Sequence, residues 1–205
     1  MGRVSDAKER LMKAVLELLW TNSYGSTTID QICDKASVKK GSFYYFFESK
    51  ADVAVAALDT EFQKNRVELD AIFSATVPPL DRIRNYFDFC YRLQAKMKSQ
   101  CGCVLGCPLF TLGSEVSTQE AKLRKKIEEI LEYKGKYLTS AIREAHDAGL
   151  LHAPDPAAKA RIVRAYMEGL LTQARIQNDL EVLREGAEGV FAILGVRDAR
   201  VAAAV

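Results

Sequence analysis

Apolar residues recur at three- and four-residue spacing along most of the chain, and this period constrains the fold more than any other feature. The first such stripe comprises Ala7, Leu11, Ala14, Val15, Leu18 and Leu19. Because an α-helix has about 3.6 residues per turn, the spacing gives a helix one apolar face that can pack on a core. No strand pattern, internal repeat or low-complexity block occurs in the sequence. The chain is therefore predicted to be all-α.

Capping signals divide this helical pattern into about nine helices. Thr28-Ile29-Asp30-Gln31 and Ser49-Lys50-Ala51-Asp52 have the form of capping boxes, and Asp155-Pro156 places a cap residue before a proline in the first turn. The first fifty residues are expected to form three short helices. Longer or later helices are expected near 50–73, 80–99, 108–114, 118–147, 156–177 and 179–194.

Composition favours a globular, cytoplasmic protein. Of the 205 residues, 48% are apolar and 27% are charged, and no apolar run is long enough for a transmembrane helix. The start of the chain lacks an apolar signal-peptide core. The five cysteines are expected to be thiols, because an odd number in a reducing compartment argues against a disulfide framework. No cofactor and no membrane association are expected.

The small positive charge of the chain is concentrated at its start. Residues 1–50 hold 8 Lys and Arg against 6 Asp and Glu, and the other 155 residues hold 21 of each. The same fifty residues are predicted to be three short helices, with a tight turn around Ala36 to Val38 between the second and third. This arrangement is that of a helix-turn-helix, although two charges alone are a weak sign of nucleic-acid binding.

The stretch KKGSFYYFF, residues 39–47, places two lysines and a glycine before five consecutive aromatic residues. On a helix, Phe43 and Phe47 lie four residues apart and can pack on the first two helices, while Tyr44 and Tyr45 point away. An ordinary core segment with a solvated edge would give a similar composition. A helix that enters the major groove of DNA has the same requirements, namely an apolar back and an outward face that can donate to phosphates.

The beginning of this short helix is slim and basic. Lys40 and Ser42 lie at or near its first turn, and Gly41 adds almost no bulk there. Lys50 lies at the start of the following helix, where backbone N–H groups also favour an anion. These residues are candidate contacts to DNA phosphates.

The segment TTIDQICDKASVKKGSFYYFFESKADV, residues 27–53, resembles the TetR family of bacterial transcriptional regulators. The resemblance implies an N-terminal DNA-binding domain, a helical ligand-sensing domain, and a homodimer joined by the last two helices. The expected division is residues 1–50 for the helix-turn-helix domain and 51–198 for the effector-binding and dimerisation domain. Residues 199–205 are expected to be a disordered tail.

Carried over by position, the resemblance assigns DNA contacts to Thr28, Lys40, Gly41, Ser42, Tyr44, Tyr45 and Lys50. Lys39 stands where a small Ser or Thr usually caps the recognition helix, and it adds a candidate contact to phosphate or base. Phe46 stands where His is common, and Ser23 replaces a usual glycine. The operator sequence therefore cannot be transferred from relatives.

Cys101, Cys103 and Cys107 form a second unusual stretch, SQCGCVLGCPLF. Three thiols could ligate zinc or Cu(I), but no fourth Cys or His lies near, so no metal site is expected. One thiol could instead be a reactive sensor, and all three could be small fillers at a helix junction. Both interpretations remain open.

Gly102-Cys103-Val104-Leu105-Gly106 resembles a motif of NemR- and AcuR-type members of the family, some of which respond to reactive electrophiles. This likeness makes Cys103 the candidate sensor. Cys107 stands where that subgroup commonly has Asn. A non-covalent effector pocket is the alternative, with candidate lining residues Phe87, Tyr91, Phe110, Tyr133 and Tyr137, although aromatic residues at helical spacing are also typical of a core.

The sequence thus predicts a repressor that a small molecule or electrophile releases from a near-palindromic operator in double-stranded DNA. An activator, or a regulator with a non-covalent pocket, fits the same residues. A cysteine-dependent enzyme is the alternative from another class. Catalysis would need a base beside the thiol, and His146 and His152 are the only histidines.

Overall fold

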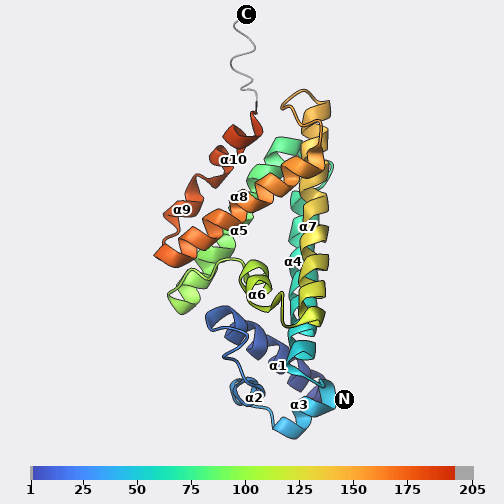
Figure 1. The fold of residues 1–205 in the computed structure, drawn as a ribbon, viewed down its shortest axis with the longest axis vertical. Helices are drawn as coiled ribbons and strands as arrows, with labels where there is room; N and C mark the ends of the chain where they lie inside the picture. Colours follow the sequence, from blue (N-terminus) through green and yellow to red (C-terminus); the bar gives the residue numbers. More distant parts are fainter. Residues whose placement is uncertain (1, 197–205) are drawn as a thin grey trace, which may run out of the picture. The chain divides into compact units, whose positions relative to one another are not determined.

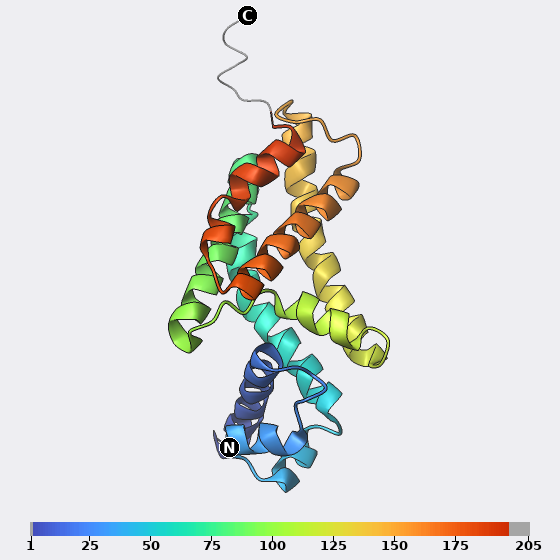
Figure 2. The same ribbon diagram turned by 60° about the vertical axis from the view of Figure 1, so that its left-hand side comes forward.

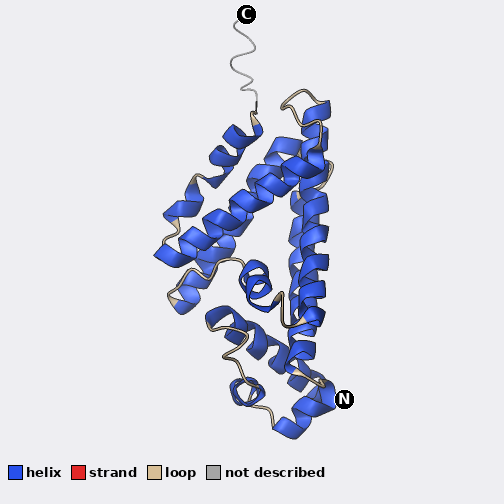
Figure 3. Ribbon diagram, in the orientation of Figure 1, coloured by secondary structure: helices blue, strands red, loops and turns tan. Residues whose placement is uncertain are grey.

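The structure, a computed structural model, describes residues 2–196, and all regular secondary structure within this range is helical (Figure 1, Figure 3). The all-α prediction is confirmed. None of the described helices is both long and apolar enough to cross a membrane. The tail predicted at 199–205 lies outside the described residues. The helices are α1 (Gly2–Thr21), α2 (Ile29–Ala36), α3 (Lys40–Phe46), α4 (Lys50–Ile72), α5 (Pro79–Cys101), α6 (Pro108–Val116), α7 (Ala121–Asp147), α8 (Pro156–Gln177), α9 (Glu181–Arg184) and α10 (Gly186–Leu194).

The contacts group these helices into two compact units. The first unit contains the described residues up to Arg66 together with Pro108–Leu131, and the second contains Val67–Cys107 together with the described residues from Glu132 onward. The long helices α4 and α7 contribute residues to both units. The functional division expected after residue 50 stays a prediction.

The core of the first unit is built where α1, α2 and α3 meet. Leu11, Val15, Ile32 and Phe43 are fully buried. The capping box predicted at Thr28 is confirmed, since its hydroxyl accepts from Gln31 N and the Gln31 side chain accepts from Thr28 N. These contacts fix the start of α2 and hold the α2–α3 pair on α1.

The turn between α2 and α3 is held from α1. α2 ends at Ser37, which has left-handed backbone angles (φ 51°, ψ 48°), and the chain enters α3 three residues later. The Arg10 guanidinium of α1 donates to the carbonyls of Ala36 and Ser37, at 3.0 and 3.3 Å. A side chain of α1 thereby satisfies carbonyls at the end of α2.

The second unit packs α8 against α9 and α10, and α10 also packs against α5 (Figure 2). The helix predicted over 179–194 is wrong as a single element, because the chain breaks at Glu185 into α9 and α10. Gly186, the first residue of α10, packs too closely for a side chain, since a Cβ there would lie 2.9 Å from the Phe87 ring and 3.0 Å from Leu170. The described residues thus hold ten helices in place of about nine.

Two other helix ends differ from the sequence prediction. α7 begins at Ala121 and not at 118, because the backbone N–H groups of Gln119 and Glu120 still bond to Val116 O at the end of α6. Asn178, directly before the range 179–194 that was expected to be helical, closes α8 with left-handed backbone angles. Its side chain also accepts from Val104 N at 2.9 Å.

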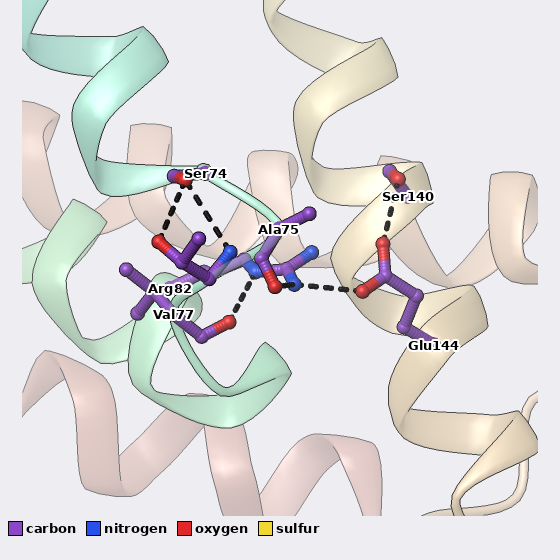
Figure 4. A network of polar contacts seen from close by, with 7 residues as sticks. Ser74, Ala75, Val77, Arg82, Ser140 and Glu144 are labelled. Carbon is purple, nitrogen blue, oxygen red and sulfur yellow. Dashed lines mark hydrogen bonds and ion pairs between the residues drawn. The ribbon is translucent and has the colours of Figure 1, made fainter.

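A buried arginine organises the α4–α5 connection within the second unit (Figure 4). The guanidinium of Arg82 donates to Val77 O at 2.7 Å and to Ala75 O at 3.2 Å. It also forms an ion pair of 2.7 Å with Glu144 of α7, which accepts from Ser140 at 3.1 Å. The Arg82 side chain is 3% exposed, so its charge depends on these partners.

Candidate nucleic-acid interface

The two faces of α3 differ sharply in burial. Phe43 is fully buried and Phe47, directly after the helix, is 6% exposed. Tyr44 and Tyr45 are 53% and 75% exposed, and the Tyr44 ring meets the edge of Phe43 with centroids 5.4 Å apart. The buried rings of Phe43 and Phe47 therefore anchor the helix, while Tyr44 and Tyr45 project from its exposed face and end in hydroxyl groups.

Gly41 lies in the first turn of α3 and is exposed. A Cβ added at this position would meet nothing within 4 Å, and the residue lacks the positive φ that would call for glycine. Neither packing nor backbone geometry within the described chain explains the glycine. A close approach from outside by another molecule would explain it.

The remaining candidates in this region lie at the first turn of α3, except Thr28, which caps α2. Lys39, Lys40, Ser42 and Thr28 are all exposed. As the departure at Lys39 suggested, its side chain makes no capping bond to α3. The Lys40 ammonium lies 2.7 Å from an Asp30 carboxylate oxygen of α2, and this bond raises the pKa of Lys40. The Lys40 charge is therefore held between α2 and α3 in the absence of DNA.

Lys50 is placed differently from the other candidates. Its ammonium donates to the carbonyls of Tyr24 and Thr27, at 2.6 and 2.8 Å, and lies 4.0 Å from the centroid of the Tyr24 ring. Burial lowers the pKa of this lysine. Lys50 thus joins the start of α4 to the α1–α2 loop, and its contact with phosphate stays a prediction.

The same loop is also bound by Glu115 of α6, a residue that the sequence interpretation did not single out. Its carboxylate accepts from Tyr24 N at 2.8 Å and from Gly25 N at 2.7 Å. The Tyr24 hydroxyl reaches Glu120 at 3.4 Å, and burial with nearby carboxylates raises the pKa of Tyr24 to about 12. α6 is thereby tied to the segment that leads into α2.

The cysteine junction places its three thiols in different surroundings. Cys101 and Cys103 are exposed, and the Cys101 thiol donates to Met97 O at 3.2 Å. Cys107 is half-buried and donates to the carboxylate of Glu168. Within residues 2–196, no group of three His, Cys, Asp or Glu side chains is arranged to hold a metal ion.

Gln94 shapes the backbone that leads to Cys107. Its amide oxygen accepts from Leu105 N and Gly106 N, at 3.1 and 2.9 Å, and its amide nitrogen donates to Gly106 O at 3.0 Å. Gly106 has a φ of 69°, which glycine adopts without strain. The buried Gln94 side chain therefore holds the turn before α6 together with Asn178, which accepts from Val104 N, and Arg175, which donates to Leu105 O at 3.1 Å.

Three of the five aromatic candidates for an effector site lie in one cluster of the second unit. Tyr133 contacts Tyr137 with ring centroids 5.5 Å apart, and Tyr137 stacks on Phe73 at 5.0 Å. Phe73 meets Tyr86 at 5.6 Å, and Tyr86 meets Phe87 at 6.3 Å. The structure therefore brings Phe87, Tyr133 and Tyr137 together through two further rings.

The other two aromatic candidates lie apart from this cluster. Tyr91 is half-buried and its ring lies 5.9 Å from the guanidinium of Arg184 in α9. Phe110 lies in α6, which belongs to the first unit.

Two family models match the chain. The model described as "Bacterial regulatory proteins, tetR family" matches residues 11–57, which contain α2 and α3. The model described as "Tetracyclin repressor-like, C-terminal domain" matches residues 79–190. Together they cover the helix-turn-helix and most of the second unit.

Several known proteins are similar over most of their length. An uncharacterised HTH-type transcriptional regulator of Lactococcus lactis subsp. lactis is 30% identical, over 87% of this chain and 88% of its own. The transcriptional regulator AcuR of Cereibacter sphaeroides is 31% identical, over 83% of this chain and 77% of its own. The crystal structure of reduced Escherichia coli NemR, a protein named as a transcriptional repressor, has a TM-score of 0.76 at 25% identity and covers 90% of this chain and 95% of its own. The likeness to NemR- and AcuR-type proteins is confirmed.

Proposed function

The chain belongs to the TetR family of bacterial transcriptional regulators, and from this premise we propose that it is a dimeric repressor released from its operator by a small effector. As a member of this family it is a DNA-binding regulator. Repression is proposed because NemR, among its relatives, is named as a repressor. A protein with this role acts in the cytoplasm, where bacterial DNA is found.

The outward face of α3 carries the proposal. Lys39, Lys40, Ser42, Tyr44 and Tyr45 are exposed beside a glycine with open space around it, and the opposite side of the helix is anchored by Phe43. We assign phosphate and groove contacts to these residues together with Gly41 and Thr28. Lysine and tyrosine donate to phosphate oxygens, and a glycine in the first turn lets the backbone approach the duplex.

The proposed dimer pairs α8, α9 and α10 of two copies. Large apolar side chains are exposed on these helices, since Ile162 and Ile176 of α8 are 46% and 78% exposed and Ile193 of α10 is 40% exposed. Burial of such side chains between two copies favours association. Two recognition helices of a symmetric dimer would meet successive major grooves about one helical turn (~34 Å) apart, so the operator is expected to be a near-palindrome.

The proposed signal passes through α6. The chain runs from Cys107 directly into α6, whose Glu115 binds the backbone of Tyr24 and Gly25 ahead of α2. A change at the cysteine junction that shifts α6 would therefore pull on the entrance to the helix-turn-helix. A coupling free energy of about 1–3 kcal/mol is typical of such linkage.

Cys103 is the proposed sensor for electrophiles. Its thiol is exposed and can be reached by a reagent from solvent. Modification there would place new bulk at the turn that precedes α6. If Cys103→Ser released DNA at the same doses of the same agents as the unaltered protein, Cys103 would not be the sensor.

The decisive experiment selects bound sequences from random double-stranded DNA with the purified full chain. We expect enrichment of a near-palindrome and a dimer in light scattering. Substitution of Tyr44 and Tyr45 by Ala should abolish the enrichment and leave the thermal unfolding temperature nearly unchanged. Absence of any sequence preference at low ionic strength would refute the proposed function.

A further inference from the structure

Glu168 of α8 has an unmet hydrogen-bonding requirement inside the second unit. The residue is 8% exposed, and its Oε2 atom is buried without a hydrogen-bond partner, the one such side-chain atom recorded among the described residues. Its carboxylate accepts from the Cys107 thiol. A buried polar atom that lacks a partner costs about 1–3 kcal/mol, and more when the group is charged. The position of Oε2 therefore indicates that a donor is missing.

The charge of Glu168 contributes to the raised pKa of two neutral side chains, Tyr86 and Cys90. Burial raises the pKa of Cys90 to about 12 and that of Tyr86 well above its ordinary value, so both keep their protons at neutral pH. These two side chains are hydrogen-bonded to each other. The Tyr86 ring continues into the aromatic cluster through Phe73 and Phe87. Uncharged rings and thiols are thus part of the electrostatic environment of the carboxylate.

Two cations act on Glu168 without supplying the missing donor. Burial is the larger influence and raises the pKa of the Glu168 carboxyl group, whereas the charges of Lys134 in α7 and Arg164 in α8 lower it. Neither side chain donates to Oε2, which has no partner. The Arg164 guanidinium lies against Gly135, 3.8 Å from the place where a Cβ would stand. The donor must therefore come from outside the described chain.

We propose that Glu168 anchors a non-covalent effector distinct from the electrophiles proposed to act at Cys103, and that this effector is a small organic amine with an aromatic or apolar body. An ammonium group supplies the N–H donor that Oε2 lacks, and aromatic rings favour cations near their faces. This inference rests on the proposed function, because it names the ligand class of that regulator. Binding would act next to Cys107, the residue that directly precedes α6.

Three probes of the same shape test the charge preference on the full-length protein. Benzylamine, benzyl alcohol and benzoate differ only in the group presented to Glu168. We expect benzylamine to raise the unfolding temperature and to release operator DNA, and the other two to do so at concentrations at least tenfold higher. Similar effects of all three probes, or a preference for benzoate, would overturn the proposal. No shift with any probe would also overturn it and would assign Oε2 to an ordered water.

The matched variants are Glu168→Gln and Glu132→Gln, which remove one negative charge from a buried and an exposed position respectively. Glu168→Gln should weaken benzylamine binding by about tenfold to a hundredfold, the range for one hydrogen bond to a charged group, while Glu132→Gln should not change it. Undiminished binding by Glu168→Gln would contradict the assignment. The probe comparison needs no variant, so it decides the question even if Glu168→Gln does not fold. DNA binding measured without any amine tests the proposed function separately.

Discussion

The polar side chains of the recognition helix α3 are exposed to solvent, whereas the polar side chain of Glu168 lies in the interior of the second unit. The polar groups of α3 face solvent and rest on a buried aromatic anchor, Phe43. Glu168 is buried, and water cannot complete its hydrogen bonds freely. The outer site can therefore change without affecting folding, whereas any change at the inner site is also a change in stability. This difference suits a surface for DNA and an interior that detects a ligand.

The variant with the largest expected effect, Phe43→Ala, tests whether the buried anchor of α3 stabilises the fold while its outward face does not. Phe43→Ala should lower the free energy of unfolding by about 3–5 kcal/mol, because it removes a fully buried ring. Tyr45→Ala, at a position 75% exposed, should change it by less than about 0.5 kcal/mol. Urea unfolding of both variants measures the contrast. Comparable losses in the two would remove the distinction between anchor and outward face.

Gly41→Ala sharpens the same distinction at the outward face. The added methyl group meets nothing within 4 Å, and alanine is the better helix former, so the variant should be as stable as the parent or more stable by about 0.5–1 kcal/mol. Against the duplex the same methyl group should cost about 1–2 kcal/mol in binding, roughly a tenfold loss. Fluorescence polarisation and thermal unfolding measured on one sample separate the two effects. Unchanged affinity for DNA would mean that the backbone at this position does not approach the duplex.

Glu144→Gln tests a buried site in place of the exposed face of α3. It removes the ion-pair partner of the buried Arg82. The free energy of unfolding should fall by about 1–2 kcal/mol, since Arg82 stays buried while Glu144 is 43% exposed and its bond is screened. The bond to Arg82 lowers the pKa of Glu144 below its ordinary value of 4.5.

A carboxylate with a lowered pKa in the folded state stabilises the protein above the unfolded value, and that contribution is lost as the pH falls. The difference between parent and Glu144→Gln should therefore be constant at neutral pH and shrink once the pH falls below about 4.5. Urea unfolding at a series of pH values measures it. A difference that grows toward acid would contradict this account of the Arg82 network.

Lys40→Gln is expected to have the smallest effect. Removal of one phosphate contact should weaken binding to all DNA sequences and reduce the slope of log affinity against log salt by about one unit. Asp30→Asn is the matched variant, because it frees the Lys40 ammonium from its ion pair and should strengthen binding instead. Identical salt slopes for Lys40→Gln and the parent protein would exclude Lys40 from the phosphate contacts.

Features set by neighbours in the sequence could be predicted. The capping box at Thr28 and the cap at Asp155 depend on residues three positions apart, and both form as expected. The four-residue spacing of Phe43 and Phe47 likewise predicted which side of α3 is buried.

Features set by distant residues could not be predicted in the same way. The close packing of Gly186 depends on Phe87, and the Glu115 contact with Tyr24 joins residues 91 positions apart. Glu168 follows the buried Met167 in α8, and only packing decides whether such an acid faces solvent or the interior. The periodicity of the sequence does not predict these contacts between distant residues.

The grip of Glu115 on the α1–α2 loop has an evolutionary consequence. Its two oxygens bind the main-chain N–H groups of residues 24 and 25, atoms that every amino acid except proline possesses. The side chains of residues 24 and 25 can therefore change during evolution, except to proline, while both hydrogen bonds to Glu115 are kept. A proline at either position would remove one of the two hydrogen bonds, and prolines at both would remove the link.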